Sequence, residues 1–260
     1  MSNLNVTLVQ ANQIWENKEA NFANYERLLQ GVSKTDLILL PEMFNTGFSM
    51  NAPELAEQMN DSKSIEWLKS MANKLDAAIY TSLIIQENDK FFNRGLFVEP
   101  NGTLHVYDKR KTFGLAGEDK VFASGDKEVI VNFRGWKIRL QICYDLRFPE
   151  IALNKHQGGE PAYDLLLYVA NWPERRSQHW RNLLPARAIE NQCYLAALNR
   201  VGVDQLDLNY SGDSCVIDLH GNRLKEFSNE EIVFSCELDR AELDEMRLKL
   251  PFLKDRVFKD

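Results

Sequence analysis

With 260 residues and an apolar content of 44%, the chain can bury one large core or two small ones. Its formal net charge of −7 argues against nucleic acid or an anionic membrane surface as a partner. No apolar run approaches a membrane span, and the N-terminus enters a strand-like pattern directly. These two patterns predict neither a membrane span nor a signal peptide. The four cysteines lie far apart without a CxxC pair, so we expect a reducing cytoplasmic location and no disulfide framework or zinc site.

The first half of the chain alternates between two hydrophobic periods, which predict strands and helices respectively. Residues Pro100-Asn101-Gly102 predict a hairpin turn between two of the strands. Apolar residues at helical spacing (Ile65, Leu68, Met71, Leu75) predict one helix, for which Asp61 or Ser62 can be the N-cap. The other predicted segments are a helix at 17–32 and strands at 5–10, 36–40, 78–85, 94–98 and 103–107.

The second half repeats this alternation and ends in a mixed aromatic and charged tail. The predicted strands are 129–133, 136–142, 164–170, 194–198, 214–219 and 232–238, and the predicted helices lie near 149–156, 178–192 and 240–248. Because strands and helices interleave without a linker, repeat or low-complexity segment, we expect one domain over residues 1–260 with a layered α/β architecture. The tail near 250–260 is a candidate to pack on a partner subunit.

Four predicted strands end in a polar side chain: Glu42, Lys109, Cys143 and Asn171. Each also has a structural alternative. Glu42 can cap a helix, and Lys109 can lie in a solvated basic loop. Cys143 can be a small buried hydrophobe, and Asn171 can bond to loop backbone. Ligands nevertheless gather beyond the carboxyl ends of strands in open α/β sheets. Cys143 also lies between a strand and Pro149, a residue that suits a first helical turn, so its thiol is predicted to project from an elbow. Asn171 is a candidate to contact the ligand.

Three segments around these residues resemble motifs of the nitrilase superfamily of carbon–nitrogen hydrolases. The resemblance covers nearly the whole chain and implies a four-layer α-β-β-α sandwich that assembles as a homodimer. Candidate interfaces are the helices near 149–156 and 178–192 and the C-terminal tail. The motifs are Leu39-Leu40-Pro41-Glu42, Tyr107-Asp108-Lys109 and Cys143-Tyr144-Asp145-Leu146-Arg147-Phe148-Pro149-Glu150.

The resemblance implies a catalytic triad of Glu42, Lys109 and Cys143. A second glutamate that often assists in the family falls on Glu118, within a predicted loop at 113–121. The family often has histidine two residues beyond the lysine, where this chain has Lys111.

Two further segments, 171–176 and 186–192, are similar to the omega-amidase branch of the superfamily. That branch hydrolyses the distal amide of small 2-oxo acids, such as 2-oxoglutaramate or 2-oxosuccinamate, to the dicarboxylate and ammonia. Other branches act on deaminated glutathione, N-carbamoyl compounds or nitriles, and a catalytically inactive nitrilase-like binding protein is a further alternative.

The residue types themselves suit amide hydrolysis through a cysteine thioester, with no metal or organic cofactor. Cys143 would attack as a thiolate, with Lys109 lowering the thiol pKa. Lys109 and the backbone N–H of Tyr144 would hold the oxyanion. Glu42 would take the thiol proton, protonate the departing ammonia and then activate water.

A small-molecule amide that carries a carboxylate calls for a cationic side chain in the pocket. Arg147, four residues after the nucleophile, is the candidate, and its alternative is an ion pair with Asp145 or Glu150. Trp172 and Phe113 can wall the pocket, although aromatic residues at strand ends are often core.

Two other thiol chemistries remain as alternatives. A papain-type protease requires a histidine base, and His179 is the one to test because it precedes a predicted helix. A redox sensor is disfavoured because no resolving cysteine is apparent. The remaining cysteines lie in or beside apolar runs, which is typical of core residues: Cys193, Cys215 and Cys236.

Overall fold

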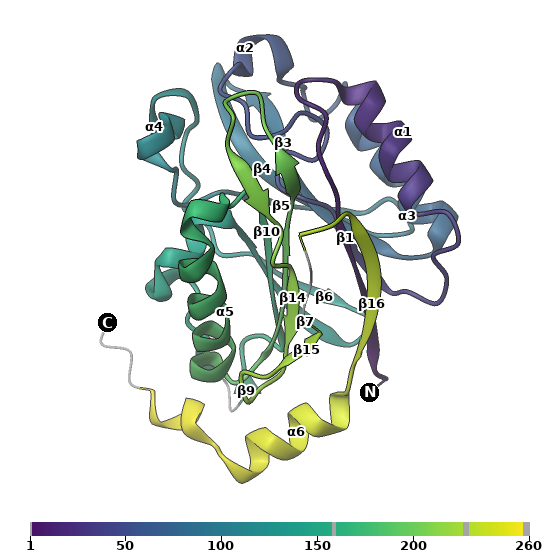
Figure 1. Cartoon of the computed structure of the whole chain (residues 1–260). Helices are drawn as coiled ribbons and strands as arrows, with labels where there is room; N and C mark the ends of the chain where they lie inside the picture. The colour runs from purple at the N-terminus through teal and green to yellow at the C-terminus, as the bar shows by residue number, and fades with distance from the viewer. Residues whose placement is uncertain (1, 158–159, 226–228, 257–260) are drawn as a thin grey trace.

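The computed structural model describes residues 2–157, 160–225 and 229–256 and shows two six-stranded β-sheets packed face to face (Figure 1). Helices α1 and α3 cover the outer face of one sheet, and α5 covers the outer face of the other. This arrangement confirms the predicted four-layer α-β-β-α sandwich.

The first sheet has the strand order β16-β1-β2-β3-β4-β5, in which β1, β2 and β3 are parallel and β16, β4 are antiparallel to their neighbours. Its strands are β16 (Ile232–Leu238), β1 (Leu4–Gln10), β2 (Leu37–Leu39), β3 (Ala78–Glu87), β4 (Lys90–Val98) and β5 (Leu104–Asp108). The helices of this half are α1 (Lys18–Leu28), α2 (Ala52–Leu55) and α3 (Lys63–Leu75). The side chain of Ser62 accepts from the backbone N–H of Ile65 and caps α3.

The second sheet has the order β15-β14-β11-β10-β7-β6, with β7, β10 and β11 parallel. Its strands are β15 (Arg223–Lys225), β14 (Cys215–Ile217), β11 (Tyr194–Asn199), β10 (Leu165–Ala170), β7 (Trp136–Ile142) and β6 (Ile130–Phe133). The main helices of this half are α5 (Ser177–Asn191) and α6 (Arg240–Lys249). Two small hairpins complete it: β8 (His156–Gln157) with β9 (Glu160–Pro161), and β12 (Val201–Val203) with β13 (Asn209–Ser211).

The largest apolar core lies between the two sheets and contains residues from both, such as Leu39 and Phe97 from the first and Leu140 and Leu167 from the second. Continuous burial on both strand faces explains why these strands read as unbroken apolar runs. The outer layer of α1 and α3 forms a second cluster around Phe22 and other side chains. The two sheets are therefore held in a fixed relation, which places their strand ends against each other.

One predicted element is wrong: residues 149–156 do not form a helix. Two 3₁₀ segments, η2 (Cys143–Arg147) and η3 (Pro149–Ile151), precede the short strand β8. The side chains of Arg139 and Gln141 donate to the carbonyl of Ile151, which is therefore not left for a helical bond. The Ile151 carbonyl is thus satisfied by buried side chains of β7 and needs no helical partner.

The C-terminal segment up to residue 256 contacts its own chain. Leu253 is buried, and its backbone N–H donates to the side chain of Gln192 at 3.2 Å. Arg256 donates to the carbonyl of Asn154 at 3.1 Å. Residues 257–260 of the predicted tail lie outside the described residues.

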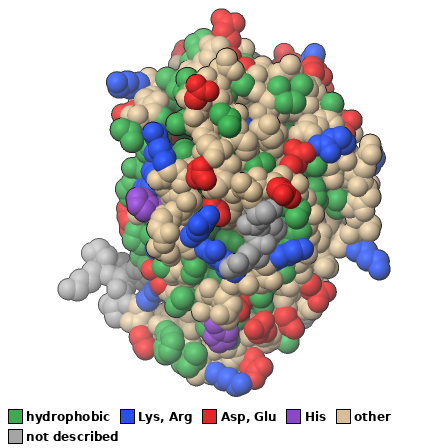
Figure 2. All heavy atoms as spheres, viewed as in Figure 1, with side chains coloured by type: hydrophobic (Ala, Val, Ile, Leu, Met, Phe, Trp, Pro, Cys, Tyr) green, Lys and Arg blue, Asp and Glu red, His purple; other side chains and the backbone are tan. Residues whose placement is uncertain are grey.

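Two surface properties bear on the expected partners. On the face shown in Figure 2, basic and acidic side chains are interspersed, without a segregated basic surface. None of the helices in the described ranges combines the length and the apolar character that crossing a membrane requires.

Candidate active site

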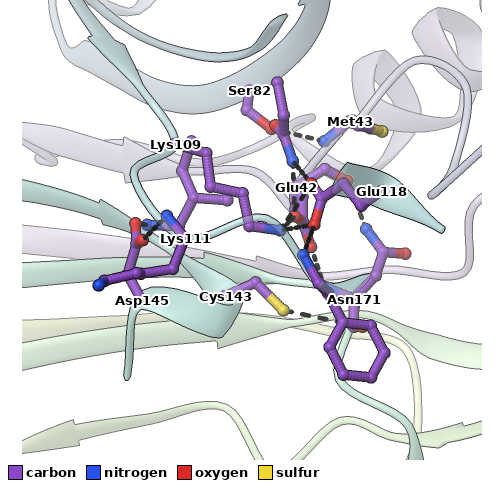
Figure 3. A network of polar contacts seen from close by, with 12 residues as sticks. Glu42, Met43, Ser82, Lys109, Lys111, Glu118, Cys143, Asp145 and Asn171 are labelled. Carbon is purple, nitrogen blue, oxygen red and sulfur yellow. Dashed lines mark hydrogen bonds and ion pairs between the residues drawn. The ribbon is translucent and has the colours of Figure 1, made fainter. Parts of the chain in front are cut away.

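The polar side chains that follow β2, β5, β7 and β10 meet at one edge of the sandwich (Figure 3). The backbone N–H of Asn171 donates to Oε2 of Glu42 at 2.8 Å, and the Asn171 side chain donates to the Glu42 carbonyl at 2.6 Å. Lys109 donates to Oε1 of Glu42 at 2.8 Å. The structure thus brings together the strand-end residues predicted from sequence, across both sheets.

The ammonium of Lys109 is buried and lies between two carboxylates. It donates to Oε1 of Glu42 and also to both oxygens of Glu118 at 2.9 Å. Burial by itself would lower the Lys109 pKa, but the charges of Glu118 and Glu42 outweigh it and hold the pKa well above its ordinary value. The two carboxylates therefore favour the cationic form of Lys109.

Glu118 is held by helical turns, whereas the sequence predicted a loop at 113–121. A 3₁₀ turn, η1 (Gly114–Ala116), precedes it, and Glu118 begins the short helix α4 (Glu118–Val121). The intervening Gly117 has a φ of 77°, which glycine adopts without steric cost. The backbone N–H of Phe113 donates to Oε2 of Glu118 at 2.5 Å. This bond ties the Glu118 carboxylate to the start of the turn that precedes it.

Asn93 on β4 joins the two carboxylates, and sequence reasoning missed it. Its side-chain amide donates to Glu42 at 2.8 Å and to Glu118 at 3.1 Å. The available signal was a polar residue just before a predicted apolar strand, but such a residue more often faces solvent. Through these two bonds Asn93 bridges the two carboxylates and fixes their relative position.

Cys143 lies on a strained elbow, as the sequence predicts. Its φ is 43°, a left-handed conformation that residues with a Cβ rarely adopt. The neighbouring Asp145 is fully buried and accepts from the backbone N–H groups of Ile142 and Lys111, each at 3.0 Å, and from the hydroxyl of Tyr107 at 2.7 Å. Asp145 therefore ties the elbow to the chain around Lys109.

The surroundings of Cys143 favour the neutral thiol over the thiolate. Burial raises its pKa, and the charge of Glu42 raises it further. Lys109 lowers the pKa as expected, but the net shift is well above the ordinary value. The Cys143 Sγ atom faces the carbonyl of Asn171 at 3.9 Å. Attack by Cys143 therefore needs a base, and the carboxylate of Glu42 is adjacent.

A cavity of about 470 Å³ opens above Cys143 and Lys109. The predicted substrate residues Arg147, Asn171, Trp172 and Phe113 all line it, as does Tyr144. Further lining residues that the sequence analysis did not assign include Phe48, Arg175, Arg176 and Tyr210. The cavity thus joins the reactive thiol to an aromatic wall and several guanidinium groups.

The alternative role for Arg147, an ion pair with a nearby acid, is wrong. In the described part of the chain Arg147 pairs with neither Asp145 nor Glu150, and Glu150 instead lies 3.6 Å from the ammonium of Lys111. The guanidinium of Arg147 lies over the ring of Trp172, 4.6 Å from its centroid, and its Nη1 atom is 3.1 Å from Nδ1 of His179.

Within the described part of the chain, the other cysteines and the histidines form neither a redox pair nor a papain-type pair with Cys143. Burial raises the pKa of both Cys193 and Cys215 to about 12, which fits their core position. Cys236 is only half-buried, on the edge strand β16, so its prediction as a core residue holds in part. Across residues 2–157, 160–225 and 229–256, no histidine is hydrogen-bonded to Cys143, which removes the support for a papain-type pair.

Comparisons with known proteins agree with this geometry. A family model described as carbon-nitrogen hydrolase matches residues 5–248. The chain is 42% identical over 256 residues to the omega-amidase YafV of Escherichia coli K12, covering 98% of this chain and 97% of that protein. It is 34% identical over 240 residues to the 2-oxoglutaramate amidase of Bacillus subtilis, covering 90% of each.

A solved structure agrees as well. The CN-hydrolase superfamily protein XC1258 of Xanthomonas campestris, which has an arsenic adduct in its active site, superimposes with a TM-score of 0.98. It is 40% identical, and the match covers 100% of this chain and 99% of that one.

Proposed function

The chain belongs to the carbon–nitrogen hydrolase family and is an amidase, and we propose that its substrate is the distal amide of a short 2-oxo acid. The products would be the dicarboxylate and ammonia, and 2-oxoglutaramate or 2-oxosuccinamate fits this description. The observation that carries the proposal is a buried thiol, ammonium and carboxylate set that opens into a cavity lined by arginines. The names of the relatives support the same substrate class.

Acylation would begin with proton transfer from the Cys143 thiol to Glu42. The raised thiol pKa makes this base necessary, and Asn171 and Asn93 hold the Glu42 carboxylate in place. The sulfur would attack the amide carbon and form a tetrahedral oxyanion. Glu42 would then return the proton to the amide nitrogen, the C–N bond would break, and ammonia would leave behind a thioester on Cys143.

The oxyanion would be stabilised by one N–H of Lys109 and by the backbone N–H of Tyr144. Both residues line the cavity beside Cys143. Glu118 would act by positioning Lys109, because both of its oxygens are within 2.9 Å of the ammonium. Removing one oxyanion donor from such a site typically costs about 3 kcal/mol in the barrier.

Deacylation would reuse the same groups. Glu42 would take a proton from water, the resulting hydroxide would attack the thioester carbon, and the carbon–sulfur bond would break. The proton would then return to the Cys143 sulfur and restore the thiol. Glu42 would thus act as base and acid in both half-reactions.

Selection would occur at the other end of the substrate. Arg147 has no acid partner within the described residues and faces the cavity beside Trp172, so it is placed to pair with the substrate carboxylate. Phe113 and Trp172 would enclose the short carbon chain between that carboxylate and the amide.

The test is ammonia release from purified enzyme with 2-oxoglutaramate, glutamine, a nitrile and an N-carbamoyl amine of similar length. We expect the highest kcat/KM for 2-oxoglutaramate. A preference for the nitrile or the N-carbamoyl compound would contradict the proposed substrate and leave the amidase chemistry at Cys143 to be assigned to another branch.

For assembly and location we propose one domain per chain, a homodimer and a cytoplasmic setting. Free thiols at four positions support a reducing compartment. Exposed apolar side chains on α5 and α6, Ile189 and Leu248, support a second copy as the partner. Light scattering that shows a monomer at micromolar concentration would contradict the dimer.

A further inference from the structure

Several cationic side chains line the cavity, and three of them have no acidic partner among the residues described. The guanidinium groups of Arg147, Arg175 and Arg176 all line it. Among the residues that the structure describes, none of these three arginines forms an ion pair with a carboxylate. The remaining cation, Lys109, is already held by two carboxylates.

The acidic residues in the cavity wall are bound to other donors. Glu16 accepts from the hydroxyl of Ser49 at 2.5 Å. Asp204 accepts from the hydroxyl of Tyr210 at 2.9 Å and from the backbone N–H of Leu206 at 2.8 Å. These acids therefore already accept hydrogen bonds from other groups, and Arg147 and Arg176 remain available to a ligand. The ligand that fits them is anionic or rich in hydrogen-bond acceptors.

Two of the arginines lie on adjoining parts of one aromatic wall. Arg147 lies over Trp172, 4.6 Å from its centroid, and over Tyr144 at 5.8 Å. Arg176 lies over Phe113 at 4.9 Å, and the rings of Phe113 and Tyr144 are themselves 4.9 Å apart. The wall therefore presents two guanidinium groups to one small substrate.

Arg176 is the more constrained of the two neighbouring arginines at the cavity mouth. Its side chain is half-buried, whereas Arg175 is exposed. Burial lowers the Arg176 pKa from its ordinary value, and the charges of Arg175 and then Arg147 lower it further. An electron-rich group beside Arg176 would offset both effects.

We propose that Arg176 contacts position 2 of the substrate and selects 2-oxo acid amides over 2-amino acid amides such as glutamine. This inference rests on the proposed function and assigns a second recognition step to the same site. Arg147 would pair with the carboxylate, which both kinds of substrate carry. Arg176 would donate to the keto oxygen, which only accepts hydrogen bonds. The ammonium of glutamine only donates and is positively charged, so it would be repelled by Arg176.

The experiment compares three substrates that differ only at position 2: 2-oxoglutaramate, glutaramate and glutamine. The variant is Arg176→Gln, and kcat/KM is measured for each pair. We expect the ratio of kcat/KM for 2-oxoglutaramate over glutamine to fall at least about tenfold, because a hydrogen bond to the keto group and a repulsion from the ammonium are both lost. Glutaramate, which has neither group, should change by less than about threefold.

Two control variants test whether selectivity comes from a contact made by Arg176 or only from the positive charge near the cavity. Arg176→Lys keeps the cation and should retain more of the 2-oxo preference than Arg176→Gln. Arg175→Gln removes the same charge from the exposed neighbour, and its 2-oxo to amino ratio should stay near that of the wild type. A melting temperature for each variant confirms that the fold is retained.

Equal losses on all three substrates in Arg176→Gln, or an equal loss of selectivity in Arg175→Gln, would overturn the role of Arg176. If the wild-type enzyme hydrolyses 2-oxoglutaramate well and the variants give either of these results, only this inference is disproved. A wild-type enzyme that fails to hydrolyse 2-oxoglutaramate disproves the proposed function and this inference together.

Discussion

Asn171 donates two hydrogen bonds to Glu42: its backbone N–H donates to Oε2 at 2.8 Å, and its side-chain amide donates to the Glu42 carbonyl at 2.6 Å. Glu42 follows a strand of the first sheet and Asn171 follows a strand of the second, so this pair crosses between the sheets at the site. The position of the carboxylate relative to Cys143 therefore depends on how the two sheets pack. A change in sheet packing would move the base away from the sulfur.

The first prediction concerns Cys143. Cys143→Ala should abolish ammonia release from any amide, because no other group at the site can form the thioester. Mass spectrometry after treatment of the wild type with a thiol-reactive substrate analogue should place the adduct on Cys143. The matched control is Cys215→Ala, which removes a fully buried core thiol and should keep most activity. Turnover by purified Cys143→Ala would contradict the covalent mechanism.

The second prediction concerns the base. Glu42→Gln keeps the shape of the side chain but removes the proton acceptor, so both acylation and deacylation should fail. We expect kcat to fall at least about a hundredfold, the lower end for loss of a general base. Glu118→Gln should reduce kcat less, since Glu118 acts through Lys109. If the two variants lose the same activity, Glu42 and Glu118 share the base role.

The third prediction concerns Lys109. Lys109→Arg should be nearly as damaging as Lys109→Ala, because a planar guanidinium does not fit between Glu42 and Glu118 in a buried site. The control is Lys111→Ala, two residues further on, where the ammonium pairs with Glu150 away from the cavity. Equal loss in both alanine variants would show that the catalytic lysine is misassigned. Steady-state kinetics with 2-oxoglutaramate measures the difference.

The fourth prediction concerns the carboxylate subsite. Arg147→Ala should raise the Michaelis constant for 2-oxoglutaramate sharply, by an amount corresponding to about 2–5 kcal/mol if the pair is desolvated. A neutral amide of similar length should be affected much less. Equal impairment of both amides would mean that Arg147 orients the Cys143 elbow and does not bind substrate.

The fifth prediction concerns pH and Asp145. Burial raises the pKa of this carboxyl from 3.8 to about 6, so the folded state binds more protons than the unfolded state between these values. The contribution of Asp145 to stability is therefore largest below pH 4 and is lost as the pH rises towards 6. The change is roughly 3 kcal/mol on the scale of 1.36 kcal/mol per pKa unit.

Urea unfolding of the wild type and Asp145→Asn at pH 4.5 and pH 7 measures this change. The variant should be less stable overall, because its amide supplies fewer acceptors for the hydrogen bonds around the elbow, and its stability should depend less on pH in this window. The same pH dependence in both proteins would show that Asp145 does not carry the effect.

Much of the fold follows from local patterns in the sequence. Continuous apolar runs predicted the central strands, because a strand covered on both faces needs an apolar side chain at every position. Glu42, Lys109 and Cys143 could be predicted as site residues because each follows one of the predicted strands. The helix predicted at 149–156 was wrong because the donors that bind the Ile151 carbonyl come from β7, and local spacing does not contain them.

Distances, ionisation and neighbours at the site were decided only by the tertiary structure. Lys109 lowers the pKa of the Cys143 thiol, and burial raises it. Which of the two is larger depends on how completely water is excluded, and this follows from the packing of the two sheets. Asn93 joins Glu42 and Glu118 from a strand that shares no motif with either. The sequence determines the residue types and their order. The pKa values of those residues depend on burial and on neighbouring charges, which are set only when distant strand ends come together in the fold.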